Sequence, residues 1–309
     1  MTASQTRSTE TAPMQREIEI TRLFDVPVDL VYAAWTEPRH VINWWGPHGF
    51  TNPECEMDVR SGGIWRIVMR GPDGVDFPSV FTYTEVVPGV RIVFKQHVEF
   101  NGVHVLDGLT SVTFAAEGKK TRLTVNSRST AVVEMAAMML QGMYIGWTQT
   151  VDRLQVLVES GSPTLGREIQ GSRLLNAPRD LVFRMFTDPE HVGNWWGPKG
   201  FSLTNEKMDV RPGGVWQFVM HGPDGRDYAN RNIYREIVEP KLLVMEHDST
   251  PKFVMTIRLL EQQDKTWLSW HMLFDTIEQR DLTANTFGAV EGLQQTLGRL
   301  EELVNAQSA

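Results

Sequence analysis

The sequence predicts an α+β protein made of two tandem copies of one domain, each a curved antiparallel sheet wrapped around a long C-terminal helix. Two short helices are expected after the first strand of each copy. Three observations predict this architecture: a set of motifs recurs at a fixed offset, apolar residues alternate with polar ones along several segments, and each half ends on an amphipathic helical stripe.

The repeat is clearest at a Trp-Trp-Gly-Pro motif, which occupies residues 44–47 and returns at residues 195–198, an offset of 151. Farther along the chain, Thr121 matches Thr266, and the offset has fallen to 145. The first copy therefore carries about six extra residues around positions 96–107. A repeat of roughly 150 residues is a duplicated domain, because the units of solenoid proteins are only about 20–50 residues long.

The expected domain boundaries follow from this repeat and from local composition. Residues 16–159 and 167–305 form the two domains, and the Ser/Gly/Pro-containing stretch 160–166 joins them as a linker. Residues 1–15 are rich in Ser, Thr and Gln and are expected to form a flexible tail. Such a duplication allows a pseudo-dimer of the two domains within one chain.

Each copy is expected to open with a strand, at residues 17–24 and 168–175, followed by a proline that starts a helix. A second proline is expected to begin a short helix, which ends at the paired tryptophans. Thr36 in the first copy and Asp188 in the second are the expected N-caps of that short helix.

The middle of each copy is expected to be a meander of strands. In the first copy Trp65, Ile67 and Met69 fall on alternate positions, which is the period of a strand with one buried face. Gly-Gly and Gly-Pro-Asp-Gly motifs separate such strands as turns. Because consecutive strands joined by short turns pair antiparallel, the sheet is expected to be antiparallel.

A long amphipathic helix is expected to close each copy. Its apolar positions are 143, 147, 151, 154 and 158 in the first copy and 290, 293, 297, 300 and 304 in the second. A helix lying across a curved sheet leaves a space between the two layers, and this space is the expected ligand site.

Composition and charge narrow the function classes. The net charge of −8 disfavours binding to nucleic acid or to anionic membranes. The sequence contains no run of about 18 apolar residues, the length that a membrane-spanning helix needs. Cys55 is the single cysteine, which fits a cytoplasmic protein without disulfides. The sequence has no His-Glu-x-x-His or paired-Cys motif, no dinucleotide-binding glycine motif and no serine-hydrolase elbow, so we expect neither a metal nor a cofactor.

Several motifs of the first copy resemble those of START/Bet v1-like domains, the SRPBCC superfamily. They lie at residues 24–31, 35–40, 43–47, 58–65, 69–74 and 83–85 and read FDVPVDLV, WTEPRH, NWWGP, DVRSGGIW, MRGPDG and YTE. The second copy carries matching motifs. Within the superfamily, the resemblance is to the branch named after the activator of Hsp90 ATPase, which is often grouped with polyketide cyclases.

The resemblance implies a helix-grip fold and the binding of a small hydrophobic or aromatic molecule in an internal cavity of one or both domains. Some members cyclise or hydrolyse such molecules, so an enzyme of the polyketide cyclase, hydrolase or lyase type is the alternative. A co-chaperone-like module is the third hypothesis. It is disfavoured because the co-chaperone that names the branch has a separate N-terminal domain, where this chain has a short tail.

Nine aromatic residues are candidate ligand-binding residues, because aromatic rings can form the wall of an apolar cavity. The alternative for each is ordinary core packing. The candidates are Trp44, Trp45, Trp65, Tyr83 and Trp147 in the first copy and Trp195, Trp196, Trp216 and Tyr234 in the second.

His104 is a candidate catalytic residue of the first copy, since acid–base chemistry needs a titratable group in the cavity. It shares its strand parity with Val112 and Phe114, which predicts an inward imidazole. A bulge near Gly108 would reverse this alternation. The alternative is a structural histidine.

Two carboxylates are the catalytic candidates of the second copy. Glu206 shares its parity with Met208, and Glu246 shares its parity with Val244. A carboxylate in an apolar cavity has a raised pKa, which suits a general acid or base. For both residues, a position at the sheet edge with access to solvent is the alternative.

Overall fold

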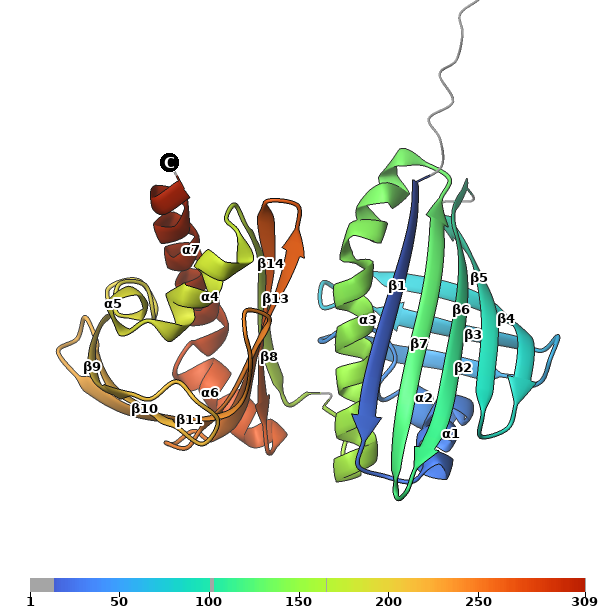
Figure 1. The fold of residues 1–309 in the computed structure, drawn as a ribbon, viewed down its shortest axis with the longest axis horizontal. Coiled ribbons are helices and arrows are strands. Elements are labelled where there is room, and N and C mark those ends of the chain that lie inside the picture. Colours follow the sequence, from blue (N-terminus) through green and yellow to red (C-terminus); the bar gives the residue numbers. More distant parts are fainter. Residues whose placement is uncertain (1–13, 101–102, 165, 309) are drawn as a thin grey trace, which may run out of the picture. The chain divides into compact units, whose positions relative to one another are not determined.

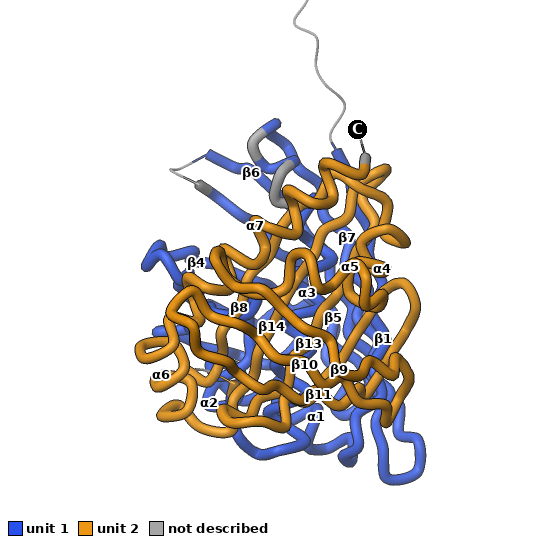
Figure 2. Tube along the Cα trace, turned by 90° about the vertical axis from the view of Figure 1, so that its left-hand side faces the viewer, with its two compact units in different colours: residues 1–163 blue, residues 164–309 orange. Residues whose placement is uncertain are grey.

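The computed structural model describes residues 14–100, 103–164 and 166–308. The chain divides into two compact units, residues 1–163 and residues 164–309 (Figure 2). Each unit has a seven-stranded antiparallel sheet with a long helix along one face (Figure 1). The predicted α+β helix-grip architecture, in two tandem copies, is confirmed.

The first unit begins with a strand and ends with the longest helix of the described residues. Its elements are β1 (Met14–Phe24), α1 (Val28–Thr36), α2 (Pro38–Val41), β2 (Thr51–Met57), β3 (Ile64–Arg70), β4 (Asp76–Val87), β5 (Arg91–Phe100), β6 (Val103–Glu117), β7 (Lys120–Ala131) and α3 (Glu134–Ser160).

The second unit repeats this order with a divided closing helix. Its elements are β8 (Glu168–Leu175), α4 (Arg179–Thr187), α5 (Pro189–Val192), β9 (Ser202–Met208), β10 (Val215–His221), β11 (Asp227–Val238), β12 (Leu242–His247), β13 (Phe253–Gln262), β14 (Lys265–Phe274), α6 (Ile277–Thr286) and α7 (Ala289–Ser308).

Both sheets have the same strand order. It is β1-β7-β6-β5-β4-β3-β2 in the first unit and β8-β14-β13-β12-β11-β10-β9 in the second, so the first strand of each unit pairs with the last. The Thr121 hydroxyl donates to the Val26 carbonyl at 2.8 Å, and the Thr266 hydroxyl donates to the Ala177 carbonyl at 2.7 Å. The two threonines matched in the sequence therefore occupy the same place in the fold.

The repeated Gly-Gly motif forms the turn that leads into β3, as predicted. Gly62 has a φ of 83°, in the region that favours glycine. A Cβ at Gly63 would lie 1.9 Å from the Asp58 carbonyl oxygen, and a Cβ at Gly214 would lie 2.0 Å from that of Asp209. Both copies thus need glycine at this position because the backbone itself fills the space.

The short helix begins differently in the two units. Asp188 caps α5 by accepting a hydrogen bond from the Glu190 backbone N–H at 2.8 Å, as predicted. The prediction that Thr36 caps α2 is wrong. Thr36 is the last residue of α1, its hydroxyl donates to the Tyr32 carbonyl one turn earlier, and Glu37 is the N-cap of α2.

The extra residues of the first copy lengthen one hairpin. β5 and β6 have 10 and 15 residues, whereas β12 and β13 have 6 and 10. A bulge interrupts the long hairpin, because Val98 pairs with Leu106 and Glu99 pairs with His104, which leaves Val105 as the additional residue. The extension packs in a second, small hydrophobic cluster of Val105, Leu106, Ala131, Ala136 and Leu140.

The closing helix also differs between the units. α3 is continuous over 27 residues, whereas α6 has 10 residues and α7 has 20. The break falls at Phe287 and Gly288, where Gly288 has a φ of 61°. Val290, a predicted position of the apolar stripe, is 51% exposed next to this break, while Leu297 and Leu300 farther along α7 are fully buried.

Each unit buries a main core between its sheet and its closing helix. In the first unit Val151 and Leu154 of α3 are fully buried against the sheet, as the stripe predicts. Among the described residues, no helix has the length and apolar character needed to cross a membrane.

Candidate ligand-binding cavity

A cavity of about 620 Å³ lies between α3 and the sheet of the first unit. Its wall is shared by the two hydrophobic clusters, because Trp45 and Phe81 belong to the main core while Leu106 and Leu140 belong to the small cluster. The space exists because the long hairpin and the long helix continue past the main core. The rest of the wall is mainly apolar and includes Pro47, Phe50, Met69, Phe77, Pro78, Val98, Val105, Met143 and Trp147.

The segment after α2 places Trp45 in the cavity wall. Its neighbour Trp44 turns into the core, where the indole N–H donates to the Ala34 carbonyl at 2.9 Å. Trp45 instead packs edge-on against Trp65 and Trp147, with ring centroids 4.4 and 5.5 Å away. The paired tryptophans therefore supply one core side chain and one cavity side chain.

A buried arginine fixes this segment to the closing helix. Arg153 of α3 is 1% exposed, and Arg299 holds the same place on α7. Backbone carbonyls just past a short helix lack helical partners, and the guanidinium groups satisfy them. Arg153 donates to the carbonyls of Asn43, Trp45, Gly46 and Pro47 at 2.9–3.3 Å, and Arg299 donates to those of Asn194, Gly197, Pro198 and Phe201 at 2.9–3.1 Å.

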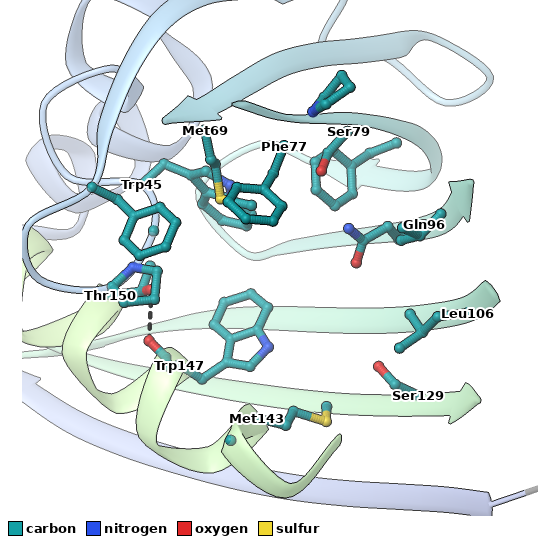
Figure 3. Close-up of a pocket in the computed structure, with 18 of the residues that line it drawn as sticks. Trp45, Met69, Phe77, Ser79, Gln96, Leu106, Ser129, Met143, Trp147 and Thr150 are labelled. Atoms are coloured by element: carbon teal, nitrogen blue, oxygen red, sulfur yellow. Dashed lines mark hydrogen bonds between the residues drawn. The ribbon is translucent and has the colours of Figure 1, made fainter. Parts of the chain in front are cut away.

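Three uncharged polar side chains line the cavity from the sheet: Ser79 on β4, Gln96 on β5 and Ser129 on β7. Figure 3 shows the Trp147 indole projecting from α3 into the space, with Gln96 and Ser129 beyond it. Gly108 lies on the strand between them, and a Cβ there would approach the Gln96 Cβ and the Ser129 Oγ to 3.4 Å each. The cavity thus combines an apolar wall with a small group of hydrogen-bonding side chains.

The structure brings two of the nine aromatic candidates to this cavity, Trp45 and Trp147. Trp44, Trp65 and Tyr83 lie in the core behind it, at most 1% exposed. The candidates of the second unit are at most 6% exposed and belong to its core cluster: Trp195, Trp196, Trp216 and Tyr234.

The core tyrosines have hydroxyl groups without a hydrogen-bond partner among the described residues. Tyr83 and Tyr234 are 1% and 0% exposed. Burial raises the pKa of both phenols, because it disfavours the charged form. The strand bulges just after Tyr83, and Glu85 turns outward, where it lies 3.4 Å from Arg91. The tyrosines therefore remain neutral core residues.

The inward position predicted for His104 is wrong. The bulge at Val105 reverses the alternation of β6, so His104 turns to the outer face of the sheet. Its Nε2 atom lies 3.0 Å from the Asp107 carboxylate, and its ring stacks on that of His97 with centroids 4.0 Å apart.

The inward position predicted for Glu206 is also wrong. Glu206 is exposed and is the extra residue of a bulge, since Lys207 pairs with Gln217 and Asn205 pairs with Phe218. The bulge turns Asn205 inward in its place, where the side-chain oxygen accepts a hydrogen bond from the indole of the neighbouring Trp216 at 2.8 Å.

Glu246 lies on the outer face of the second sheet, contrary to its predicted position, and forms an ion pair with Arg235. The inner face of β12 carries Leu243, Met245 and His247, which are the buried alternate residues. The alternation was assigned to the wrong set because the outward strand positions of β12 are also apolar.

His247 is a buried titratable residue that the sequence analysis missed. It is 6% exposed, its Nδ1 donates to the Pro251 carbonyl at 2.7 Å, and its Nε2 lies 3.0 Å from the Asn230 side chain. Burial lowers its pKa. The repeat offset of 151 places His247 where the first copy has Gln96, and this correspondence was the available signal.

Arg153 and Arg299 were missed as well. The search for an apolar stripe passes over charged residues, although both arginines lie two residues after a stripe position, Val151 and Leu297 respectively. An arginine at the same place within both stripes was the signal that could have found them.

Fold and cavity together define a duplicated helix-grip domain. The family model for Activator of Hsp90 ATPase homolog 1-like protein matches residues 25–159 and residues 176–305. These two segments make up most of the chain, so the chain belongs to that family and carries two tandem domains of it.

Several solved structures are similar to this chain. A protein from Chromobacterium violaceum is 26% identical, with 46% of this chain and 96% of that chain covered and a TM-score of 0.40. A protein from Nitrosomonas europaea is 23% identical, with 47% and 95% covered and a TM-score of 0.41. DynU16, from the dynemicin biosynthetic locus, is 20% identical, with 93% and 98% covered and a TM-score of 0.37. No curated protein matches this chain.

Proposed function

We propose that the first domain binds a small, mainly hydrophobic molecule with an aromatic or planar part in the cavity between α3 and the sheet. The observation that carries the proposal is the cavity itself. Its volume of about 620 Å³ lies within the range of roughly 300–1,000 Å³ typical of small-molecule sites.

The chemistry of the wall supports the same class of ligand. The rings of Trp45 and Trp147 offer flat apolar surfaces, and the flexible side chains of Met69 and Met143 adapt to irregular shapes. Gln96 adds an amide that can donate and accept hydrogen bonds. A ligand with one polar end and a larger apolar body matches this distribution.

The titratable groups favour holding a ligand over transforming it. The acidic residues along the cavity are Asp76 and Glu99, but their side chains are 45% and 61% exposed; Asp76 is paired with Arg70, and the Glu99 carboxylate lies beside His97 on the outer face. General acid–base catalysis needs a group within hydrogen-bond reach of the substrate. The former catalytic candidates His104, Glu206 and Glu246 lie on outer faces, so the enzyme hypothesis has less support than binding.

The proposal is tested by titrating the full chain with N-phenyl-1-naphthylamine, an uncharged aromatic probe whose fluorescence rises in apolar sites. The variant Gly142→Phe fills the cavity from α3, because Gly142 lines it and a Cβ there would meet no atom within 4 Å. We expect its probe affinity to fall by at least about tenfold, or about 1.4 kcal/mol.

The matched control is Gly298→Phe. Gly298 is a helical glycine of α7 that also has no atom within 4 Å of an added Cβ. This variant should bind the probe as the parent chain does. If the parent chain binds no probe, or if both variants lose binding equally, the proposal is wrong.

A further inference from the structure

The outer face of the long β5–β6 hairpin carries a group of metal-ligating side chains that the cavity does not use. His97 and Glu99 point outward from β5, while His104 and Asp107 point outward from β6. Their side chains are 54%, 61%, 37% and 53% exposed, so they lie at the surface within reach of an ion.

These side chains converge around one carboxylate. The Oδ1 atom of Asp107 lies 3.1 Å from Nδ1 of His97 and 3.0 Å from Nε2 of His104. The two imidazole rings stack with centroids 4.0 Å apart and planes inclined by 26°. Glu99 lies on the far side of His97, with Oε1 3.4 Å from Nε2.

We propose that His97, His104 and Asp107 bind a divalent transition-metal ion such as Zn²⁺. One ligand atom from each of the three residues lies within 4.8 Å of the others. Tetrahedral ligands at zinc distances lie roughly 3.3–3.6 Å apart, so small side-chain rotations bring these atoms around a common centre. Imidazole nitrogen and carboxylate oxygen are ligands that Zn²⁺ accepts. Water completes the fourth position, while Glu99 lies beside the other ring nitrogen of His97.

The charge of the group suits a cation. Two neutral imidazoles and the carboxylates of Asp107 and Glu99 together carry two negative charges, which balance a divalent ion. The ion binds the neutral imidazoles, because only an unprotonated ring nitrogen has a lone pair to offer.

The site belongs to the first domain alone. Its residues lie on the hairpin that is longer in the first copy, and by the repeat offsets of 151 and 145 the second copy has Asp248 where the first has His97 and Lys252 where the first has Asp107. Its ligands are spread over two strands and depend on the bulge at Val105, which is why no local sequence motif marks it. Bound metal would join β5 to β6 on either side of that bulge.

The test is isothermal titration of the full chain with ZnCl₂ in a non-chelating buffer, with the variants His97→Gln and His104→Gln. Both histidines are surface residues, so the variants should keep the parent circular dichroism spectrum. We expect each variant to bind Zn²⁺ at least about tenfold more weakly than the parent chain. Co²⁺ should give visible absorption bands with the parent chain that His104→Gln loses.

The matched control is His221→Gln in the second domain. His221 is likewise a strand histidine at the surface paired with an aspartate, Asp227 at 2.6 Å, but it belongs to no group of three metal-ligating side chains among the described residues. This variant should bind Zn²⁺ as the parent chain does. The proposal fails if the parent chain binds no Zn²⁺, or if His97→Gln and His104→Gln bind it as tightly as His221→Gln.

Discussion

The two domains share a scaffold but fill their interiors differently. In the second domain Trp270 of β14 packs against Trp196 with ring centroids 4.8 Å apart. The equivalent position of the first domain, by the offset of 145 that relates these strands, is Val125. A large side chain from the sheet thus covers the inner tryptophan in one domain, and a small one stands there in the other.

The closing helices differ in the opposite sense, because here the first domain has the larger side chain. Trp147 of α3 covers Trp45 from the helix side, and the matching residue of α7 is Leu293, as the paired arginines fix the correspondence. The first domain also has the longer hairpin and the unbroken helix that enclose the cavity. The comparison teaches that the repeated motifs build the scaffold, whereas a few unrepeated residues and one extension change how each interior is packed.

The largest effect is expected from Trp270→Val, which gives the second domain the residue of the first. Trp270 is 3% exposed, and its removal leaves a cavity that the helix does not fill. We expect a loss of about 3 kcal/mol in the free energy of unfolding, measured by urea denaturation followed by circular dichroism.

The counterpart Trp147→Val should cost only about 1 kcal/mol, because that side chain is partly exposed beside an existing cavity. It should instead weaken binding of the naphthylamine probe. Equal losses of stability in the two variants would contradict the different packing of these two tryptophans.

The shared part of the scaffold is probed by Arg153→Met and Arg299→Met. Each change leaves four backbone carbonyls without their guanidinium donor, and we expect a loss of about 2 kcal/mol in unfolding free energy. The same denaturation measurement applies. A loss in one domain and none in the other would show that the arginines do not play the same role in both.

The smallest effects concern pH, where the domains should respond in opposite directions. Burial lowers the pKa of His247 below its ordinary value of 6.5, so the unfolded chain takes up a proton before the folded one. Stability therefore falls as the pH drops below about 6.5. His247→Gln should reduce this acid sensitivity in melting curves at pH 5.5 and 8.

His97 behaves in the reverse sense. Its hydrogen bond to Asp107 raises its pKa, so its contribution is present below about pH 6.5 and is lost as the pH rises through the folded value. His97→Gln should therefore lower the melting temperature at pH 5.5 more than at pH 8. A larger drop at pH 8 would contradict this assignment.

The fold was predictable because its signals are repeated and redundant. Two copies of the same turns, prolines and helical stripes support one another, and alternation on β3 places Trp65 and Ile67 in the core correctly. Gly63 shows why such motifs persist, since the backbone leaves no room for a side chain.

The site was less predictable because it depends on departures from regular alternation. Bulges at Val105 and Glu206 turn the predicted inward residues outward, and a bulge has no reliable signature in one sequence. The predicted inward position of Glu246 was wrong for a different reason, since both faces of β12 carry apolar residues. Gln96 and Ser129, polar residues of the cavity, are brought together only by the exact register of two successive hairpins, in which each pairs with Gly108.

The central claim is that the cavity of the first domain binds a hydrophobic ligand. It is tested most directly by NMR of the full chain with ¹³C-methyl methionine during titration with N-phenyl-1-naphthylamine. Met69 and Met143 line the cavity, and Met220 is the counterpart of Met69 in the second domain. We predict that the signals of Met69 and Met143 shift and saturate at one equivalent of probe while that of Met220 stays in place. A shift of Met220 with Met69 and Met143 unchanged would contradict the account.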